Sequence, residues 1–206
     1  MSKPVIAVDI DDVLSSQVDV LIAFSNERYG TNLSHADFMI PGEYWGYYER
    51  VWGLGKDLGA ERFQTFLREK YPLRQQIEEK AIRAITALKK SHRLDLVTSR
   101  GADYYEPTLE WLEKHAPGLF EGVHFVDLWA GETGLKTTKA KICKEIGAGY
   151  LIDDNAEHCN LAAEAGVSAL LFGEFGWNLH HKLHPRVVRI ADWEEVLEYF
   201  DARSRR

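Results

Sequence analysis

The chain alternates short apolar runs with longer segments in which apolar residues recur at helical spacing, and this alternation limits the folds open to it. Short apolar runs separated by helical segments are typical of parallel sheets, whose strands are joined by crossover helices. Several of the runs are continuously apolar, as strands covered on both faces tend to be. We expect strands at residues 4–9, 94–98, 123–126, 150–152 and 168–172. The sequence therefore predicts an α/β fold built on a parallel sheet.

The segments between these runs predict the crossover helices. Residues 77–90 carry a one-sided apolar stripe, formed by Ile77, Ala81, Ile82, Ile85 and Leu88. Residues 108–115, 140–146 and 156–165 have similar patterns. A final helix is expected after Asp192, a residue type that caps helix N-termini, and it would pack on the sheet through Trp193, Val196, Leu197 and Phe200.

One region, residues 29–71, breaks this rhythm. It contains no strand pattern, and aromatic residues crowd in it: Phe38, Tyr44, Trp45, Tyr47, Tyr48, Trp52, Phe63 and Phe66. The length of 206 residues suits one domain with an insertion. We therefore expect a core domain of residues 1–28 and 72–206, and a helical insertion of residues 29–71 that sits over one edge of the sheet like a lid.

Composition excludes several classes of function. The net charge of −7 argues against binding of a nucleic acid polymer, which needs clustered Lys and Arg. No apolar stretch approaches the roughly 20 residues of a membrane-spanning helix. The N-terminus has no signal-peptide pattern, and the two cysteines, Cys143 and Cys159, lie in helical patterns typical of buried thiols. We expect a cytoplasmic protein without a membrane partner, as a monomer or homodimer.

Two of the predicted strands end in carboxylates. Asp9 and Asp11 follow the first strand, and Asp153 and Asp154 follow the strand at 150–152. A single acidic pair is also compatible with a solvated strand end or a helix N-cap. Ligands of open parallel sheets bind at the carboxyl ends of the strands, where four carboxylates together would need a cation. Mg²⁺ prefers oxygen ligands and is usually held by carboxylates together with a substrate phosphate, so we expect a phosphate-handling magnesium site.

Two further segments are placed to take part in this site. The strand at 94–98 ends in Thr98 and Ser99, whose hydroxyls, with nearby main-chain amides, can hold phosphate oxygens. A helix is predicted to start near Lys136, Lys139 and Lys141, and a lysine there can balance the charge of a carboxylate and a phosphoryl group. Each of these signals is weak alone.

From Val5 to about Phe172 the chain resembles the haloacid dehalogenase superfamily of aspartyl phosphatases, which has a Rossmann-like sheet. Its four motifs occur in order, matched by Asp9-Ile10-Asp11, Thr98, Lys139 and Asp153-Asp154. The helical insertion resembles the superfamily's cap of the first type (C1). Within the superfamily the chain is most similar to the 5′(3′)-deoxyribonucleotidase group and its bacterial relatives. This similarity lies in the aromatic insertion, in residues 151–155, and in Leu171-Phe172 followed by Gly176-Trp177-Asn178.

The resemblance implies a role for each motif residue. Asp9 would be the nucleophile, and Asp11 would protonate the leaving oxygen while its main-chain carbonyl binds the metal. Asp153 would bind Mg²⁺ directly, and Asp154 would hold a metal-bound water or Lys139. Thr98 would hold nonbridging phosphate oxygens. The function implied is Mg²⁺-dependent hydrolysis of a small phosphorylated substrate, most simply a nucleoside 5′-monophosphate.

Substrate contacts are expected from Phe38 and Trp45, on which a nucleobase could stack, although cap aromatics also serve as packing residues. Ser99 and Arg100 are further candidates for substrate binding, with structural pairing as the alternative for Arg100. The histidines His180, His181 and His184 are expected in a surface loop. Two other functions stay open: a phosphatase of a sugar phosphate or similar metabolite, and a Mg²⁺-binding phospho-acceptor domain of signalling.

Overall fold

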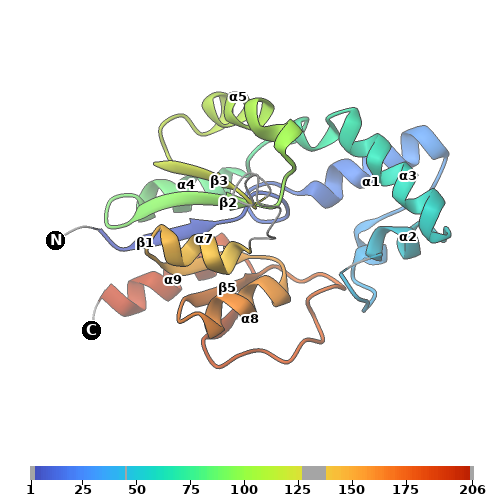
Figure 1. The fold of residues 1–206 in the computed structure, drawn as a ribbon. Coiled ribbons are helices and arrows are strands. Elements are labelled where there is room, and N and C mark those ends of the chain that lie inside the picture. Colours follow the sequence, from blue (N-terminus) through green and yellow to red (C-terminus); the bar gives the residue numbers. More distant parts are fainter. Residues whose placement is uncertain (1–2, 45, 127–137, 205–206) are drawn as a thin grey trace.

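A computed structural model describes residues 3–44, 46–126 and 138–204, and within these residues one parallel sheet forms the centre of the molecule. The strand order is β3-β2-β1-β4-β5-β6, and each neighbouring pair is parallel. The strands are β1 (Val5–Val8), β2 (Arg93–Thr98), β3 (Gly122–Phe125), β4 (Ala148–Asp153), β5 (Ser168–Phe172) and β6 (Val187–Ile190). The predicted α/β class and the five predicted strands are confirmed (Figure 1).

The strand β6 was not predicted from the sequence. It pairs with β5 from Ala169 opposite Val187 to Phe172 opposite Ile190. Only its first and last residues are buried, because it lies at the edge of the sheet. A four-residue strand with two exposed central residues has neither the apolar run nor the alternation that marks the other strands.

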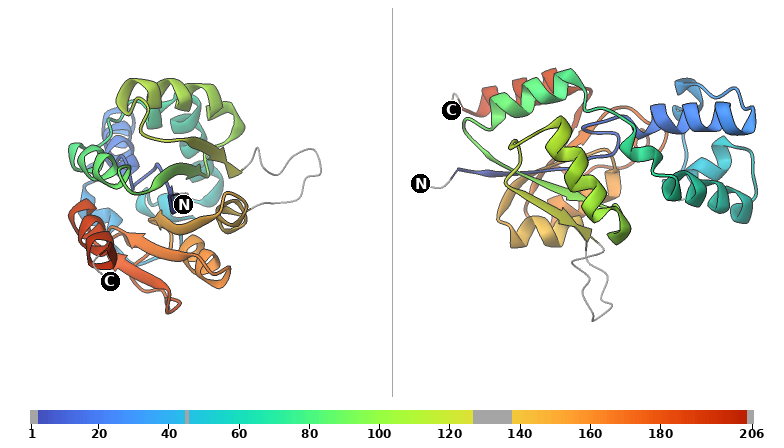
Figure 2. Two further views of the ribbon diagram at one scale, coloured as in Figure 1. Left: turned by 90° about the vertical axis from the view of Figure 1, so that its left-hand side faces the viewer. Right: turned by 90° about the horizontal axis from the view of Figure 1, so that it is seen from above.

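Helices cover both faces of the sheet (Figure 2). One face is covered by α4 (Glu79–Leu88), α5 (Tyr105–His115) and α9 (Trp193–Ser204), the other by α7 (Lys139–Glu145) and α8 (Ala156–Glu164). In β1, Ile6 and Val8 pack in the first of these two clusters, and Val5 and Ala7 in the second. This alternation explains the continuously apolar runs, since each fully buried aliphatic side chain contributes about 1.5–3 kcal/mol.

A third hydrophobic cluster builds the helical insertion, which lies at the end of the sheet opposite the two termini (Figure 1). Its elements are α1 (Gln17–Tyr29), η1 (His35–Phe38), α2 (Tyr47–Val51), α3 (Lys56–Arg68) and η2 (Tyr71–Leu73). Val18, Leu21 and Phe24 of α1 pack in this cluster with Phe38 and Phe66. We therefore propose that the insertion includes α1 as well as residues 29–71.

The remaining described segments are short or exposed. The short 3-10 helix η3 (Ala102–Tyr104) follows β2 and leads into α5. His180 at the end of a turn and His181 just after it are exposed, while His184 is half-buried before β6. Among the described helices, none combines the length and the apolar character that crossing a membrane requires.

Candidate active site

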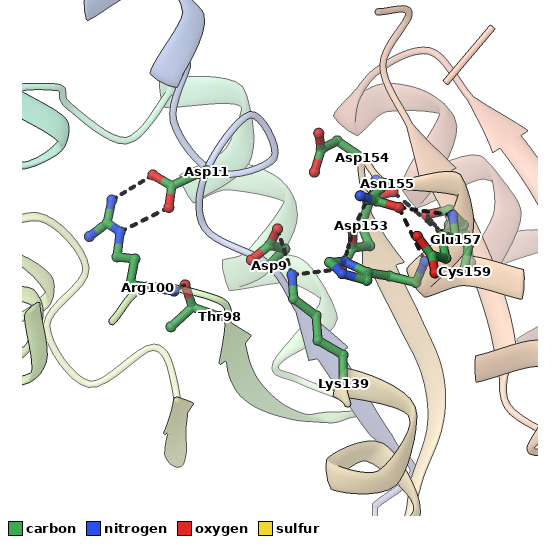
Figure 3. A network of polar contacts seen from close by, with 12 residues as sticks. Asp9, Asp11, Thr98, Arg100, Lys139, Asp153, Asp154, Asn155, Glu157 and Cys159 are labelled. Atoms are coloured by element: carbon green, nitrogen blue, oxygen red, sulfur yellow. Dashed lines mark hydrogen bonds and ion pairs between the residues drawn. The ribbon is translucent and has the colours of Figure 1, made fainter. Parts of the chain in front are cut away.

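The acidic ends of β1 and β4 lie side by side in the middle of the sheet. The two strands pair directly, with Val8 opposite Ile152, and the main-chain N–H of Asp9 donates to the carbonyl of Ile152 at 3.0 Å. Carboxylate oxygens of Asp9, Asp153 and Asp154 all lie within 4.8 Å of one another (Figure 3). The fold thus brings both acidic strand ends to one point, as ligand sites of parallel sheets require.

Lys139 is the lysine of this site. Thr138 caps α7, its side chain accepting a hydrogen bond from the main chain of Lys141, and Lys139 is the first residue of the helix. Its Nζ lies 2.7 Å from Asp9 Oδ2 and 2.8 Å from Asp153 Oδ2, and its side chain is 1% exposed. Lys141 is exposed, with its Nζ 3.9 Å from Glu145, and Lys136 lies outside the described residues. Of the lysines left open by the sequence, the structure brings Lys139 to the carboxylates.

Burial and charge shift the proton affinities of this cluster. Burial raises the pKa of Asp9 to about 6, against the attraction of Lys139 and with the repulsion of Asp153. Burial, then Asp153 and Asp9, raise the pKa of Asp154 well above its usual range. Burial also opposes the charged forms of Asp153 and Lys139, but their mutual attraction lowers the pKa of Asp153 and raises the pKa of Lys139. One ammonium group faces three carboxylates, so the cluster favours a further cation.

Asp153 and Asp154, both expected near the metal, have different surroundings in the structure. Asp153 is fully buried, and both its oxygens have partners: Oδ2 contacts Lys139, while Oδ1 accepts the N–H of Asn155 at 2.9 Å and lies 3.2 Å from His158 Nδ1. Asp154 instead lines the cavity described below. Although Asp153 falls within the carboxylate cluster, its oxygens are already engaged. Asp154 is therefore the better placed of the two to bind a cation directly.

His158 was not singled out by the sequence. Asn155 caps α8, and its side-chain oxygen accepts the main-chain N–H groups of Glu157 and His158 at 2.8 and 3.2 Å. This cap fixes His158 in the first turn, where its ring contacts Asp153 and lines the cavity. The sequence signal available was a histidine in the first turn of a helix capped directly after the acidic strand.

Asp11 points away from Asp9 toward the loop that follows β2 (Figure 3). Arg100 donates from Nε to Asp11 Oδ2 at 2.9 Å and from Nη2 to Oδ1 at 2.8 Å, and Gln75 donates to Oδ1 at 3.3 Å. A third donor atom, Arg100 Nη1, reaches Thr108 at 3.1 Å. The Arg100 side chain is only 4% exposed. The structural pairing that was the alternative for Arg100 is thus present, with Asp11 as its partner.

A cavity of about 650 Å³ connects the carboxylates to the insertion. Its core side is lined by Lys139 of α7 and by residues that follow the strands, including Asp9, Asp11, Asp154, Ser99 and Arg100. Its insertion side is lined by Tyr44, Tyr48, Phe63, Gln64 and Leu67, with Gln17 from α1. This volume lies in the range of small-molecule sites. The cavity has room for a small molecule between the acidic centre and an aromatic wall.

The expected substrate residues take different positions. Ser99 lines the cavity, and Thr98, fully buried at the end of β2, accepts the main-chain N–H of Arg100 at 3.2 Å. Phe38 is 1% exposed in the core of the insertion and is not among the lining residues, which corrects its expected role in stacking. Trp45 lies outside the described residues. Tyr48 and Phe63, whose ring centroids lie 4.9 Å apart, line the cavity instead.

The donor set fits Mg²⁺. Asp9 and Asp154 supply carboxylate oxygens at the floor of the cavity, and hard divalent cations prefer such ligands. The main-chain carbonyl of Asp11 follows Asp9 by two residues, where the resemblance to the superfamily places a third ligand. The excess negative charge of the cluster favours binding of a divalent cation.

Several solved structures share this fold. The haloacid dehalogenase-like hydrolase SP0104 from Streptococcus pneumoniae has a TM-score of 0.64 and 18% identity, over 96% of this chain and 98% of that chain. A predicted phosphoglycolate phosphatase from Haemophilus somnus 129pt has a TM-score of 0.64 and 16% identity, over 97% and 99%. The putative HAD-hydrolase YfnB from Bacillus subtilis, bound to magnesium, has a TM-score of 0.62 and 14% identity, over 98% and 100%. These likenesses show the fold.

The family match over almost the whole chain, together with the fold, identifies a phosphatase of the haloacid dehalogenase superfamily. Residues 3–205 match the model of one family within it, described as 5′ nucleotidase, deoxy (pyrimidine), cytosolic type C protein (NT5C), and the chain belongs to this family. No curated protein matches the chain. The predicted superfamily, its nucleotidase group and the assignment as an enzyme are confirmed, and the signalling alternative is not supported.

Proposed function

We propose that this chain is a Mg²⁺-dependent phosphomonoester hydrolase that acts on nucleoside 5′-monophosphates, with deoxyribonucleotides as preferred substrates. The observation that carries the proposal is the cavity of about 650 Å³, which has Asp9 and Lys139 at one end and aromatic rings of the insertion at the other. Such a cavity suits a molecule with a phosphate at one end and a planar ring at the other. The family match over residues 3–205 supports the same substrate class.

Asp9 acts as the nucleophile. Its carboxylate oxygen forms a bond to phosphorus while the ester P–O bond breaks, giving an aspartyl-phosphate. Lys139, 2.7 Å from Asp9 Oδ2, balances negative charge on Asp9 and on the phosphoryl group. Ser99, which follows β2 and lines the cavity, holds nonbridging oxygens as charge spreads over them. Thr98 is fully buried and not a lining residue, so it supports this loop by accepting the N–H of Arg100.

Asp11 carries the protons. It donates one to the leaving oxygen, and in the second step it accepts one from the water that attacks phosphorus. That attack breaks the bond to Asp9 and releases phosphate, so both aspartates return to their starting state. Arg100 and Gln75 hold the Asp11 carboxylate in the wall of the cavity between these steps, and one Asp11 oxygen turns from them toward the substrate to exchange the proton.

Asp9, Asp154 and the main-chain carbonyl of Asp11 would hold Mg²⁺, which supplies positive charge beside the reacting phosphoryl group. Asp153 stands behind them and holds Lys139 in place at 2.8 Å. In this division, Asp154 contacts the cation and Asp153 orients the lysine. The two adjacent carboxylates thus have separate tasks.

The insertion supplies the base site. Tyr48 and Phe63 present aromatic faces to the cavity, and stacking on such faces accepts any base. Gln17 and Gln64 also line the cavity, and their amide groups can hydrogen-bond to the edge of a base. Gln17 already donates to the Tyr48 hydroxyl at 3.1 Å. These residues form the base site in place of Phe38, which packs in the core of the insertion.

We further propose a cytoplasmic location and a monomeric or homodimeric state. The matched family is described as cytosolic. Cys143 and Cys159 are free and buried, which suits a reducing compartment. The oligomeric state is a prediction that size-exclusion chromatography with light scattering tests.

The substrate is tested by a screen of released phosphate. Purified protein with Mg²⁺ is given deoxyribonucleoside and ribonucleoside 5′-monophosphates, and in parallel sugar phosphates, with the Asp9→Asn variant as the control for contaminating phosphatase. We expect kcat/KM to be highest for the deoxynucleotides. Higher kcat/KM for sugar phosphates would replace the nucleotide proposal with the second phosphatase function. Equal release by the control variant would show that the measured activity does not depend on Asp9.

A further inference from the structure

The loop of residues 173–178 leaves the end of β5 and reaches the insertion. The main-chain N–H of Gly176 donates to the carbonyl of Phe38 at 2.7 Å, and the N–H of Gly42 donates to the carbonyl of Gly176 at 3.0 Å. A Cβ atom at Gly176 would overlap the carbonyl oxygen of Ile40 and the hydroxyl of Tyr47. This glycine therefore permits a close main-chain contact between the core domain and the insertion.

Trp177, the next residue, is surrounded by aromatic residues. It is 2% exposed, and its ring stacks on Phe175 with centroids 4.5 Å apart and planes inclined by 3°. Three tyrosines of the insertion meet it edge to face: Tyr44, Tyr47 and Tyr48, with centroids 6.3, 5.1 and 6.4 Å away. A residue of the core domain is thus packed in the hydrophobic cluster of the insertion.

The polar edge of the same side chain contacts the acidic centre. Trp177 Nε1 donates to Asp154 Oδ2 at 2.7 Å. The next residue, Asn178, is fully buried, and its Nδ2 donates to the main-chain carbonyl of Asp154 at 2.9 Å. Adjacent residues of one loop therefore fix both the side chain and the main chain of Asp154.

We propose that Trp177 is a positioning residue that couples the docked insertion to the cation site. By holding one oxygen of Asp154, it fixes the orientation in which the carboxylate faces the cavity, and the tyrosines of the insertion hold Trp177 in turn. This inference rests on the proposed function, because it takes Asp154 as a direct Mg²⁺ ligand. Partners that orient a metal ligand typically change metal affinity by about 10- to 100-fold when they are removed.

The Trp177→Phe variant tests the first half of the proposal. It keeps an aromatic ring in the cluster and removes the N–H that Asp154 accepts. We expect Mg²⁺ binding, measured by titration calorimetry without substrate, to weaken about 10-fold. The Mg²⁺ concentration for half-maximal phosphatase activity should rise equally, while kcat at saturating Mg²⁺ stays within about twofold of the wild type.

A matched control is Trp52→Phe. Trp52 is another buried tryptophan of the insertion cluster, and its Nε1 donates to the Ser25 hydroxyl at 2.9 Å, away from Asp154. The variant loses the same type of hydrogen bond from the same cluster. We expect its Mg²⁺ affinity to equal that of the wild type, so that general loosening of the insertion is separated from loss of the contact to Asp154.

The Gly176→Ala variant tests the coupling, because it keeps the indole and pushes the loop off the insertion. We expect it also to weaken Mg²⁺ binding, whereas Gly149→Ala should not, since a Cβ at Gly149 meets open space. Wild-type affinity in Trp177→Phe would overturn the positioning role, and wild-type affinity in Gly176→Ala alone would overturn the coupling. If the wild type itself binds no Mg²⁺, the proposed cation site fails and this inference fails with it.

Discussion

The guanidinium of Arg100 binds both carboxylate oxygens of Asp11, through Nε to Oδ2 at 2.9 Å and through Nη2 to Oδ1 at 2.8 Å. Bidentate pairs of this type fix the plane of the carboxylate as well as its position. Asp11, the proposed proton carrier, follows β1. Arg100, which holds Asp11, follows β2, and β2 pairs with β1. The orientation of Asp11 therefore depends on the docking of two neighbouring strands.

Replacing Arg100 should impair the chemical step more than substrate binding. In Arg100→Gln the bidentate contact is lost, and we expect kcat to fall about 10- to 100-fold with KM changed less than about threefold, since proton transfer by a well-placed group contributes at least that much. Steady-state kinetics on the best substrate of the screen measures this. Arg93→Gln is the matched control, because Arg93 pairs with Asp95 at the other end of β2. A raised KM with unchanged kcat would instead favour a direct contact with substrate.

Replacing Lys139 should destabilise the protein. Lys139→Met keeps the length of the side chain but leaves Asp9 and Asp153 buried without their shared cation, at a cost of about 3–5 kcal/mol in unfolding free energy. Denaturant unfolding in a chelator measures the loss, and added Mg²⁺ should recover part of it. Lys141→Met, at an exposed position of α7, should stay within about 0.5 kcal/mol of the wild type. Equal stability of the two variants would contradict the claim that Lys139 stabilises the protein as the shared cation of Asp9 and Asp153.

The pKa of Asp9 predicts a pH-dependent stability of the metal-free protein. Burial raises this pKa from 3.8 to about 6, so between these values the folded state binds the proton more tightly than the unfolded state does. The contribution of Asp9 to the unfolding free energy therefore falls as the pH rises through this window, by about 3 kcal/mol in total. The Asp9→Asn variant has no carboxylate to ionise at this position, so its unfolding free energy does not fall in this way. Its stability relative to the wild type, measured in a chelator, should increase from pH 4 to pH 7, and a difference independent of pH would contradict the raised pKa.

Phe63 should matter for nucleotides and little for smaller phosphoesters. Stacking of a base on an aromatic ring contributes about 1–3 kcal/mol, so Phe63→Ala should raise KM for the nucleotide about 5- to 150-fold. For glycerol phosphate, which has no ring, kcat/KM should be unchanged. Parallel kinetics on the two substrates measures the difference. An equal loss for both would indicate that Phe63 only supports the insertion.

The sheet and the position of its acidic centre could be predicted because both depend on local sequence patterns. Buried strands such as β5 (Ser168–Phe172) are apolar runs, and carboxylates that directly follow two such runs meet when the strands are parallel neighbours. Lys139 could be named from the resemblance, but its choice over Lys141 depends on which side of α7 faces the sheet. That choice needed coordinates.

Other features depend on contacts between distant residues. Arg100 and Asp11 are 89 residues apart, and no local pattern relates them. Phe38 and Phe63 are both aromatic residues of the insertion, yet only Phe63 lines the cavity, because the packing of the helices decides which ring is enclosed. The different roles proposed for Asp153 and Asp154 rest on side-chain direction, since Asp153 contacts Lys139 while Asp154 lines the cavity, and adjacency in sequence does not determine this direction.

The most direct test of the mechanism is to trap the aspartyl-phosphate. Wild-type protein and Asp9→Asn are mixed with the best substrate and Mg²⁺, quenched in acid within the first turnover, digested and analysed by mass spectrometry. We predict a phosphoryl adduct on the peptide that contains Asp9 in the wild type, and none in the variant. An adduct on another residue, or rapid hydrolysis by Asp9→Asn, would contradict the assignment of Asp9 as the nucleophile.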